Sequence, residues 1–353
     1  MDVTEKVNTP YSFHFRQPAE WEPHQACWLA WPSHEDLWLE DLEAARTEFV
    51  GLCRVIAEQG GEMLEILVPD QAQQALAIEA LKDLPATFHR ISFGDIWLRD
   101  TAPIFLTNPQ GDIATVRFRF NGWGEKYVLP NDAQVATQIA EIWEQSGGTA
   151  YSFPWVLEGG SVEVDGQGTC LTTRQCLLNP NRNPSMTQDA VEAGLREALG
   201  IEKVLWLEEG LLNDHTDGHI DTLARFVAPG VVICMEARDQ EDPNRAVLEK
   251  IAQDLASFTD VQGRSLKVVR IPSPGKILNQ AQEMMPASYV NFYIGNRTVV
   301  VPTYGAPYDA EAVSLIGQCF PDHRTLGLSA KAILRGGGAF LCITQQQPIS
   351  VSK

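Results

Sequence analysis

Residues 27–81 contain the segments CWLAW at 27–31, LWLEDLEAARTEFVGLCRVIAEQ at 37–59, MLEILV at 63–68 and AQQALAIEAL at 72–81. The first and third are short apolar runs of strand length, whereas the second and fourth are longer and repeat their apolar residues at helical spacing. We therefore predict a strand, a helix, a strand and a helix in that order. This alternation is typical of an α/β fold.

The same alternation continues to the end of the chain. We expect further helices at Asp132–Gln145, Thr187–Leu199, Asn244–Ser257 and Ala310–Phe320, and strands near Val204–Leu207, Val231–Met235, Leu266–Ile271, Tyr289–Ile294 and Thr298–Val301. Phe88–Phe105 and Gly159–Leu171 are predicted to form consecutive strands without intervening helices, which favours repeated mixed β/α units. No low-complexity tract or charged linker divides the chain, so a single domain over residues 1–353 is predicted.

The chain has 353 residues, and 27 Lys and Arg against 46 Asp and Glu give a formal net charge of −19. We therefore expect neither nucleic acid nor a membrane as partner, because both attract basic proteins, and we expect a cationic substrate. Met1–Lys6 lacks the basic and apolar segments of an export signal, and no apolar run reaches the ~18 residues of a membrane helix. Seven cysteines without a CxxC pair indicate reduced thiols, so we predict a cytoplasmic protein.

Two common cofactor patterns are incomplete. A dinucleotide-binding fold carries a glycine-rich turn directly after its first strand, but Ala30-Trp31-Pro32-Ser33 occupies that place. His215 and His219 have the i, i+4 spacing of a zinc pair on a helix, but Gly218 lies between them and the metalloprotease glutamate is absent. Nucleotide binding therefore gains no support from the sequence, and a zinc pair is the less favoured interpretation of the two histidines.

Reactive side chains concentrate in four segments near predicted strand ends, where loops display catalytic groups. These segments are DIWLRD at 95–100, LEGG at 157–160, DGHID at 217–221 and GGGAFLC at 336–342. A cysteine in an apolar strand such as Phe340–Thr344 is commonly an inert core residue. Three preceding glycines permit close approach of the backbone to a ligand, which favours a nucleophile at Cys342 instead.

Three of these segments also carry candidate acids and bases. His219 and Asp221 are two residues apart, so both side chains face the same side if the segment is extended; a structural histidine is the alternative. Asp100 and Glu158 have apolar neighbours, among which a carboxylate needs a partner charge to remain ionised. The alternative for Asp100 is an acid that pairs with its neighbour Arg99 or caps a turn, and the alternative for Glu158 is a solvated loop acid. A cationic substrate would instead supply the partner charge.

Seven segments distributed over nearly the whole chain carry a family resemblance. They are QPAEWEPH at 17–24, WLRDTAP at 97–103, NGWG at 121–124, LEGGS at 157–161, LLNPNRNP at 177–184, GHID at 218–221 and CITQQQP at 342–348. Together they resemble the agmatine deiminase and bacterial peptidyl-arginine deiminase family of guanidine-modifying enzymes. The resemblance implies a pentein fold, an α/β-propeller in which five pseudo-repeated ββαβ-like units surround a central channel that contains the active site.

The resemblance also implies roles for individual residues. It implies a nucleophile, a general acid/base and a glutamate that orients it, at Cys342, His219 and Glu158. It implies that Asp100 and Asp221 hold the guanidinium. The reactive segments at 95–100, 217–221 and 336–342 supply three further candidates for substrate binding, Trp97, Asp217 and Gly337. No metal or organic cofactor is implied, and a homo-oligomer is compatible with the resemblance.

Two positions depart from the family pattern: Leu341 stands where a histidine usually precedes the nucleophile, and His215 stands where an acid is more frequent. Our first hypothesis is hydrolysis of agmatine to N-carbamoylputrescine and ammonia, in the route from arginine to polyamines. The alternative is a deiminase of free or peptidyl arginine, a substrate whose carboxylate or peptide group needs different partners. A third hypothesis is an inactive pentein that acts as a binding module, but all five catalytic candidates are present.

Overall fold

The computed structural model describes residues 8–350, so the start of the chain that argued against an export signal lies outside the described residues. The described chain contains five β-sheets. The four-stranded sheet consists of β16 (Gln345–Pro348), β1 (His24–Ala30), β2 (Met63–Val68) and β3 (Ala86–Arg90). The three-stranded sheets are β4 (Ile104–Thr107), β5 (Ile113–Arg119), β6 (Thr149–Val156); β7 (Glu163–Val164), β8 (Thr169–Thr173), β9 (Lys203–Leu207); β10 (Ala224–Ala228), β11 (Val231–Glu236), β12 (Lys267–Pro272); and β13 (Tyr293–Ile294), β14 (Thr298–Thr303), β15 (Arg324–Ser329).

The five sheets share one pairing pattern. In each, an antiparallel pair is extended by a parallel strand, as in β4–β5 followed by β5–β6. Parallel strands need a crossover connection, and each crossover contains a helix: α2 (Leu42–Arg54), α3 (Gln71–Ala80), α6 (Asp132–Gln145), α8 (Gln188–Leu199), α9 (Arg245–Ser257) and α10 (Asp309–Cys319). The mixed α/β alternation predicted from the sequence is therefore confirmed.

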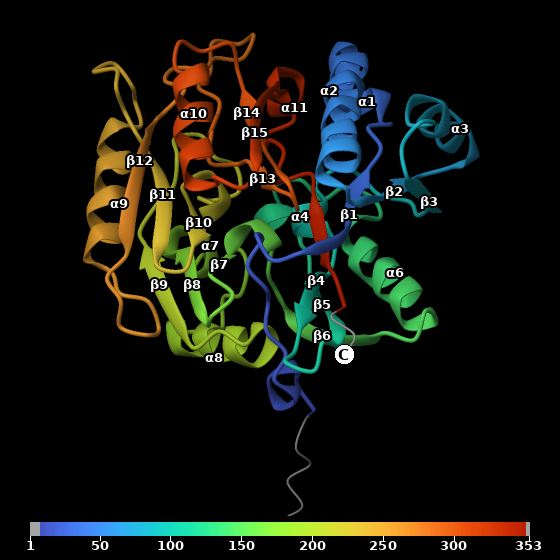
Figure 1. Cartoon of the computed structure of the whole chain (residues 1–353), viewed down its shortest axis with the longest axis horizontal. Helices are drawn as coiled ribbons and strands as arrows, with labels where there is room; N and C mark the ends of the chain where they lie inside the picture. The colour runs from blue at the N-terminus through green and yellow to red at the C-terminus, as the bar shows by residue number, and fades with distance from the viewer. Residues whose placement is uncertain (1–7, 351–353) are drawn as a thin grey trace, which may run out of the picture.

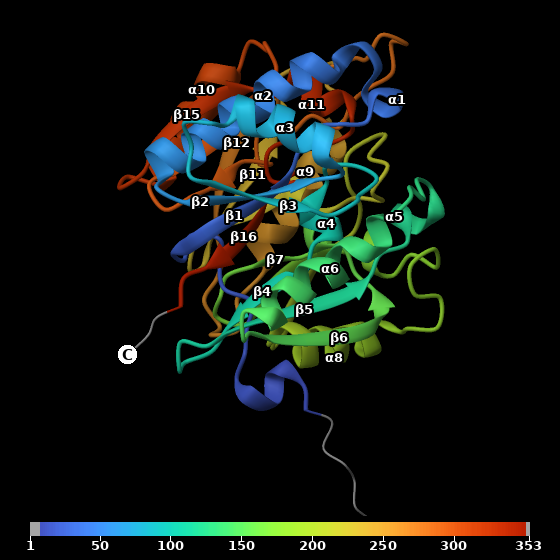
Figure 2. The same cartoon turned by 90° about the vertical axis from the view of Figure 1, so that its right-hand side faces the viewer.

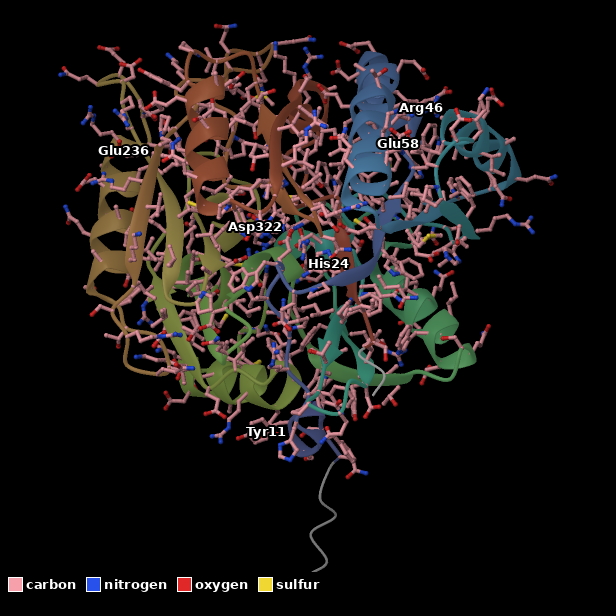
Figure 3. The ribbon with its side chains drawn as sticks, in the orientation of Figure 1. Tyr11, His24, Arg46, Glu58, Glu236 and Asp322 are labelled. Carbon is pink, nitrogen blue, oxygen red and sulfur yellow. The ribbon has the colours of Figure 1, made fainter. Side chains whose placement is uncertain are left out.

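The crossover helices lie around the outside of the strands (Figure 1). α2 shows why: its buried residues Leu42, Ala45, Phe49, Leu52 and Cys53 recur every three or four positions and form one apolar stripe. The charged side chain of Glu58, which follows α2, lies on the outer surface, whereas His24 at the start of β1 lies in the interior (Figure 3). Among residues 8–350, every helix is too short or too polar to span a bilayer.

Three predictions of local structure were wrong. The single helix expected at 37–59 is divided into α1 (Glu35–Trp38), a 3₁₀ turn, α2 and a π-helical turn, and Leu39 at the first break has φ 46°. The region 88–105 contains one helical turn, α4 (Leu98–Thr101), rather than strands alone. The strand expected at 289–294 is reduced to β13, because Arg225 Nη1 donates to the carbonyl groups of Val290 and Phe292.

Strands from the two ends of the chain pair in one sheet. β16 is antiparallel to β1, with Trp28 opposite Gln345 and His24 opposite Pro348. Figures 1 and 2 both show β16 beside β1 in the middle of the molecule. Cys342 lies in the turn directly before β16, and this pairing therefore holds the candidate nucleophile in the interior.

Candidate active site

Gly160 marks the point where three of the predicted site residues meet. A Cβ atom at Gly160 would lie 2.6 Å from His219 Nδ1, 2.8 Å from Asp221 Oδ2 and 2.9 Å from Asp100 Oδ1. Any side chain at position 160 would displace these polar groups. The segments that the sequence placed at separate strand ends therefore form one buried cluster.

Cys342 belongs to the same cluster. Its thiol donates a hydrogen bond to Asp221 Oδ2 at 3.3 Å, and Arg99 N donates to the Cys342 carbonyl at 3.1 Å. Burial, together with the charges of Asp221 and Asp100, raises the pKa of the Cys342 thiol well above its usual value. The ligand-free site therefore holds a thiol rather than a thiolate. The residue lies in a turn, so the expected apolar strand at 340–344 was wrong.

His219 and Asp221 converge although their segment is not extended. His219 precedes the 3₁₀ turn Ile220–Thr222, so the premise that both side chains share one face of a strand was wrong. Burial lowers the pKa of His219 to about 4, although the nearby Glu158 carboxylate opposes the shift. The imidazole is therefore neutral in the ligand-free site near pH 7.

Asp100 and Asp221 form a carboxylate pair, and no cationic side chain among residues 8–350 is in direct contact with it. Asp100 accepts hydrogen bonds from Trp123 Nε1 at 2.9 Å and from Gly160 N at 2.8 Å, and burial raises its pKa. Burial and the charge of Asp100 raise the pKa of Asp221 to about 8, and Asp221 Oδ1 is buried without a partner. A bound cation would relieve the repulsion between these two acids.

A chain of charged groups supports Glu158 and the loop before His219. Arg182 Nε donates to Glu158 Oε1 at 2.7 Å, and another guanidinium nitrogen of Arg182 contacts Asp217. Lys126 Nζ donates to Asp217 Oδ1 at 2.5 Å. Burial would raise the pKa of Asp217, but hydrogen bonds from Lys126, Asn181 and Arg182 outweigh it and lower the pKa. The Asp217 carboxylate is thus already paired, and Asp217 does not line the neighbouring cavity.

One group of buried side chains has a composition that could bind a metal ion. Glu158, Cys176 and His219 offer ligand atoms within 4.8 Å of one another, whereas the sequence pair of His215 and His219 does not form such a group. Burial raises the pKa of the Cys176 thiol well above its usual value. Because a thiol binds metal ions as the thiolate, this group fits a metal poorly.

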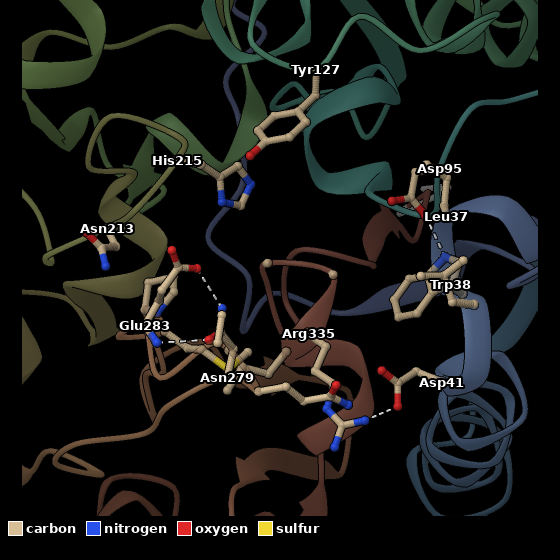
Figure 4. Close-up of a pocket in the computed structure, with 18 of the residues that line it drawn as sticks. Leu37, Trp38, Asp41, Asp95, Tyr127, Asn213, His215, Asn279, Glu283 and Arg335 are labelled. Carbon is tan, nitrogen blue, oxygen red and sulfur yellow. Dashed lines mark hydrogen bonds and ion pairs between the residues drawn. The ribbon is translucent and has the colours of Figure 1, made fainter.

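A cavity of about 770 Å³ leads toward the cluster. Trp97 and Gly337, both predicted to bind substrate, line it, and a Cβ on the adjacent Gly338 would lie 3.1 Å from Cys342 Sγ. The charged residues that line the cavity are four acids and one base: Glu40, Asp41, Asp95, Glu283 and Arg335. Arg335 is paired with Asp41. Figure 4 shows Asp41, Asp95, Glu283 and Arg335 around the cavity. The approach to Cys342 is therefore negatively charged.

The sequence analysis missed Asn291. Its Nδ2 donates to Cys342 Sγ at 3.1 Å, and its Oδ1 accepts from Cys342 N at 3.3 Å. A single signal could have identified it, because Asn291 is the one amide in the apolar run Tyr289–Ile294. The side chain fixes both the backbone and the sulfur of the candidate nucleophile.

Comparison with known proteins extends the family resemblance to almost the whole chain. The model of the Porphyromonas-type peptidyl-arginine deiminase family matches residues 16–348. The chain belongs to this family. Among its deiminase relatives, the agmatine deiminase of Ectopseudomonas mendocina is 39% identical over 98% of this chain and 99% of that protein. The agmatine deiminase of Pseudomonas aeruginosa is 36% identical with the same two coverages, 98% and 99%.

A solved structure supports the same conclusion about the fold. The agmatine deiminase of Enterococcus faecalis superimposes with a TM-score of 0.90 at 34% identity, over 98% of this deiminase chain and 99% of the other. An amidinotransferase from Microseira wollei superimposes with a TM-score of 0.57 at 14% identity and shares the fold alone. The predicted α/β pentein class is therefore confirmed.

His215 is one of the positions where this member of the deiminase family departs from the expected pattern. Its ring lies against Tyr127, with centroids 5.3 Å apart, and against Trp123 at 6.0 Å. Burial lowers the pKa of His215 despite the neighbouring carboxylates. The imidazole therefore adds no positive charge to the cavity near neutral pH.

Proposed function

We propose that this chain hydrolyses agmatine to N-carbamoylputrescine and ammonia through a covalent amidino-cysteine intermediate. The observation that carries the proposal is the convergence of an imidazole and two carboxylates on Gly160, with the Cys342 thiol hydrogen-bonded to one of these carboxylates. The acidic cavity in front of this cluster suits a substrate with a cation at each end. Relatives named agmatine deiminase support the choice of substrate.

The carboxylates would bind the guanidinium first. A guanidinium is planar and remains protonated at neutral pH, and a carboxylate can accept two of its N–H groups in one plane. Asp100 and Asp221 supply the acceptors, including the unpartnered Asp221 Oδ1. Two such contacts orient the plane so that Cys342 Sγ faces the central carbon.

The chemistry then needs one proton shuttle. Cys342 transfers its proton to His219 and attacks the guanidinium carbon, which forms a carbon–sulfur bond and a neutral tetrahedral adduct. The imidazolium returns the proton to one amino group, which leaves as ammonia, so that an amidino-thioether cation remains on Cys342. Water gives a proton to His219 as it attacks this carbon, which forms a second neutral tetrahedral adduct. The imidazolium then returns its proton to sulfur as the carbon–sulfur bond breaks, and the hydroxyl proton of the adduct passes to the departed ammonia, so that the ureido product, the thiol and ammonium result.

Other residues support these steps. We assign Glu158 to orienting the imidazole and stabilising its charged form, and Arg182 would hold Glu158 in place. Trp97 and Gly337 would contact the substrate from the cavity wall. Because its carboxylate is already paired, we assign Asp217 to holding the loop before His219 rather than to a direct substrate contact.

The repeat architecture, the compartment and the partners that we propose rest on the family and on the composition of the chain. The five sheets with one pairing pattern support five ββαβ-like units around a central channel, within one catalytic domain. The seven free cysteines and the acidic composition support a cytoplasmic enzyme without a nucleic-acid partner. A homo-oligomer is compatible with this assignment.

Substrate binding is expected to release a proton at pH 7. The pKa of Asp221 is raised to about 8 in the empty site, so this carboxyl is mostly protonated, whereas a bound guanidinium favours the carboxylate. Calorimetry of agmatine binding to Cys342→Ser, in buffers of different ionisation enthalpy, should show about one proton released per site at pH 7 and a value near zero at pH 9. Correspondingly, kcat/KM of the wild type should rise from pH 6 to pH 8 and then level off. Binding without proton release at pH 7 would contradict this assignment.

Agmatine is expected to be preferred over free arginine by at least about a hundredfold in kcat/KM, because a carboxylate in the acidic cavity loses hydration without gaining a partner. The test is ammonia release from agmatine, arginine and a blocked arginine peptide, measured side by side. Because the pKa of His215 is lowered, the preference should stay constant from pH 6 to pH 8.

A variant that tests the role of this position is His215→Glu, which introduces the acid that the family pattern more often has there. It should keep or increase the preference for agmatine, because a carboxylate attracts the terminal ammonium. If arginine and agmatine instead have similar kcat/KM at pH 8, the substrate assignment moves to the arginine deiminase alternative, and the Cys342 mechanism is unaffected.

A further inference from the structure

Two indole rings share one buried carboxylate beside the cavity. Asp95 accepts a hydrogen bond from Trp97 Nε1 at 2.7 Å and another from Trp38 Nε1 at 3.0 Å. The rings are stacked, with centroids 6.3 Å apart and planes inclined by 29°. All three residues line the cavity, and Figure 4 shows Asp95 and Trp38 together across it from His215. The two indoles therefore form one wall of the approach to the active site.

The same rings pack against the glycine segment that precedes Cys342. A Cβ on Gly336 would lie 2.8 Å from Trp38 Cη2 and equally close to Trp97 Cζ2. A Cβ on Gly338 would lie 2.7 Å from Trp97 Cζ3 and 3.1 Å from Cys342 Sγ. The two indole rings thus lie directly against the glycine segment that borders the Cys342 sulfur.

Asp95 is itself fixed by the backbone. Asp95 Oδ1 accepts from Ile96 N at 2.8 Å, and the backbone N–H groups of Gly94 and Asp95 donate to Asp132 Oδ1 at 2.6 and 3.2 Å. The side chain is buried, and the donors that it contacts are an amide and two indoles, none of which is charged. Asp95 therefore holds the two rings from a rigid turn, and its own charge is not neutralised by a contacting cation.

We propose that Asp95 is a positioning residue for substrate selection, which holds Trp38 and Trp97 as the wall against which the methylene chain and terminal ammonium of the substrate pack. This inference rests on the proposed function. Indole faces attract cations, and methylene groups pack on them. The guanidinium end is bound separately by Asp100 and Asp221, so loss of the wall should affect long substrates more than short ones.

The experiment compares agmatine with 2-chloroacetamidine, a short amidinium that alkylates the cysteine and has no chain to reach the wall. In Asp95→Asn, KM for agmatine should rise about tenfold, kcat should change less than about threefold, and the alkylation rate should stay within about twofold of the wild type. Trp38→Phe keeps a ring but lacks the N–H group, and should change KM in the same direction. Asp254→Asn alters an acid that pairs with Lys250 on the exposed side of α9, and should change neither rate.

A second measurement does not depend on turnover. The indole N–H proton resonances of Trp38 and Trp97 should shift between the ligand-free wild type and Asp95→Asn; unmoved resonances would overturn the inference. Equal losses for agmatine and chloroacetamidine would also overturn it, as would an unchanged KM in both Asp95→Asn and Trp38→Phe. A wild type that bound no agmatine would contradict the proposed function instead, and the resonances would still test whether Asp95 holds the wall.

Discussion

Replacement of Cys342 by alanine or serine is expected to reduce ammonia release from agmatine to less than about a hundredth of the wild-type rate, given the size of nucleophile effects. Alanine removes the attacking atom. Serine keeps a hydroxyl, but the hydroxyl does not ionise near neutral pH, and His219, with its pKa lowered to about 4 by burial, is a weak base for removing its proton. Retention of more than about a hundredth of the activity would rule out covalent catalysis by this residue.

Alkylation provides the control for this prediction. 2-Chloroacetamidine should add one adduct to the wild type, detected by the mass of the intact protein, and none to Cys342→Ala. Cys319→Ser replaces sulfur by oxygen at a partly exposed thiol at the end of α10, and should keep both the adduct and the activity. A wild type that neither reacts nor turns over agmatine would favour the hypothesis of an inactive binding module.

Asp221→Asn and Asp100→Asn are each expected to raise KM and lower kcat together. Each change removes a charge and an acceptor from a buried cation site, and loss of one such partner typically costs about 3–5 kcal/mol. That corresponds to a loss of at least about a hundredfold in kcat/KM, which steady-state kinetics with agmatine would measure. Unchanged kcat and KM in either variant would exclude that aspartate from guanidinium binding.

Stability distinguishes a functional role of Asp221 from a structural one. Its folded pKa is raised above the usual value, so the folded state binds the proton more tightly and loses stability as pH rises toward 8. The neutral amide of the Asp221→Asn variant would remove this penalty. Thermal unfolding at pH 9 should therefore show Asp221→Asn to be at least as stable as the wild type although it is far less active. A large fall in Tm at pH 9 would indicate that the carboxylate supports the fold.

The elements with clear periodicity could be predicted from the sequence. The strand at 63–68 and the helix at 132–145 have the predicted bounds, because each combines an apolar pattern with unambiguous ends. The helix predicted at 187–199 begins at Gln188, since Thr187 accepts the capping hydrogen bond from Ala190 N. β16 was not predicted, because its residues Gln345–Gln347 are polar and their burial depends on pairing with β1.

Some of the candidate site residues were selected by structural arguments that differ from the geometry in the structure. Asp221 and His219 were paired on the premise of an extended strand, yet the 3₁₀ turn brings them to Gly160. Asn291 was missed because its one local signal, an amide in an apolar run, does not reveal a contact with Cys342, which is 51 positions away in sequence. Asp217 was selected for its charge, but its partners Lys126 and Arg182 are 91 and 35 positions away in sequence. Motifs thus selected the candidate residues, and tertiary contacts decided which of their groups are already paired in the structure.

The pairing of β16 with β1 has a consequence for biosynthesis. Domains generally begin to fold from their N-terminal part while the ribosome is still adding residues, but β1 lacks its antiparallel neighbour until residue 348 has emerged. The turn that carries Cys342 directly precedes β16 and therefore emerges from the ribosome together with it. A nascent chain is therefore expected to acquire its nucleophile and complete its central sheet together, so that products of premature termination are inactive and expose an unpaired strand edge for quality control to recognise.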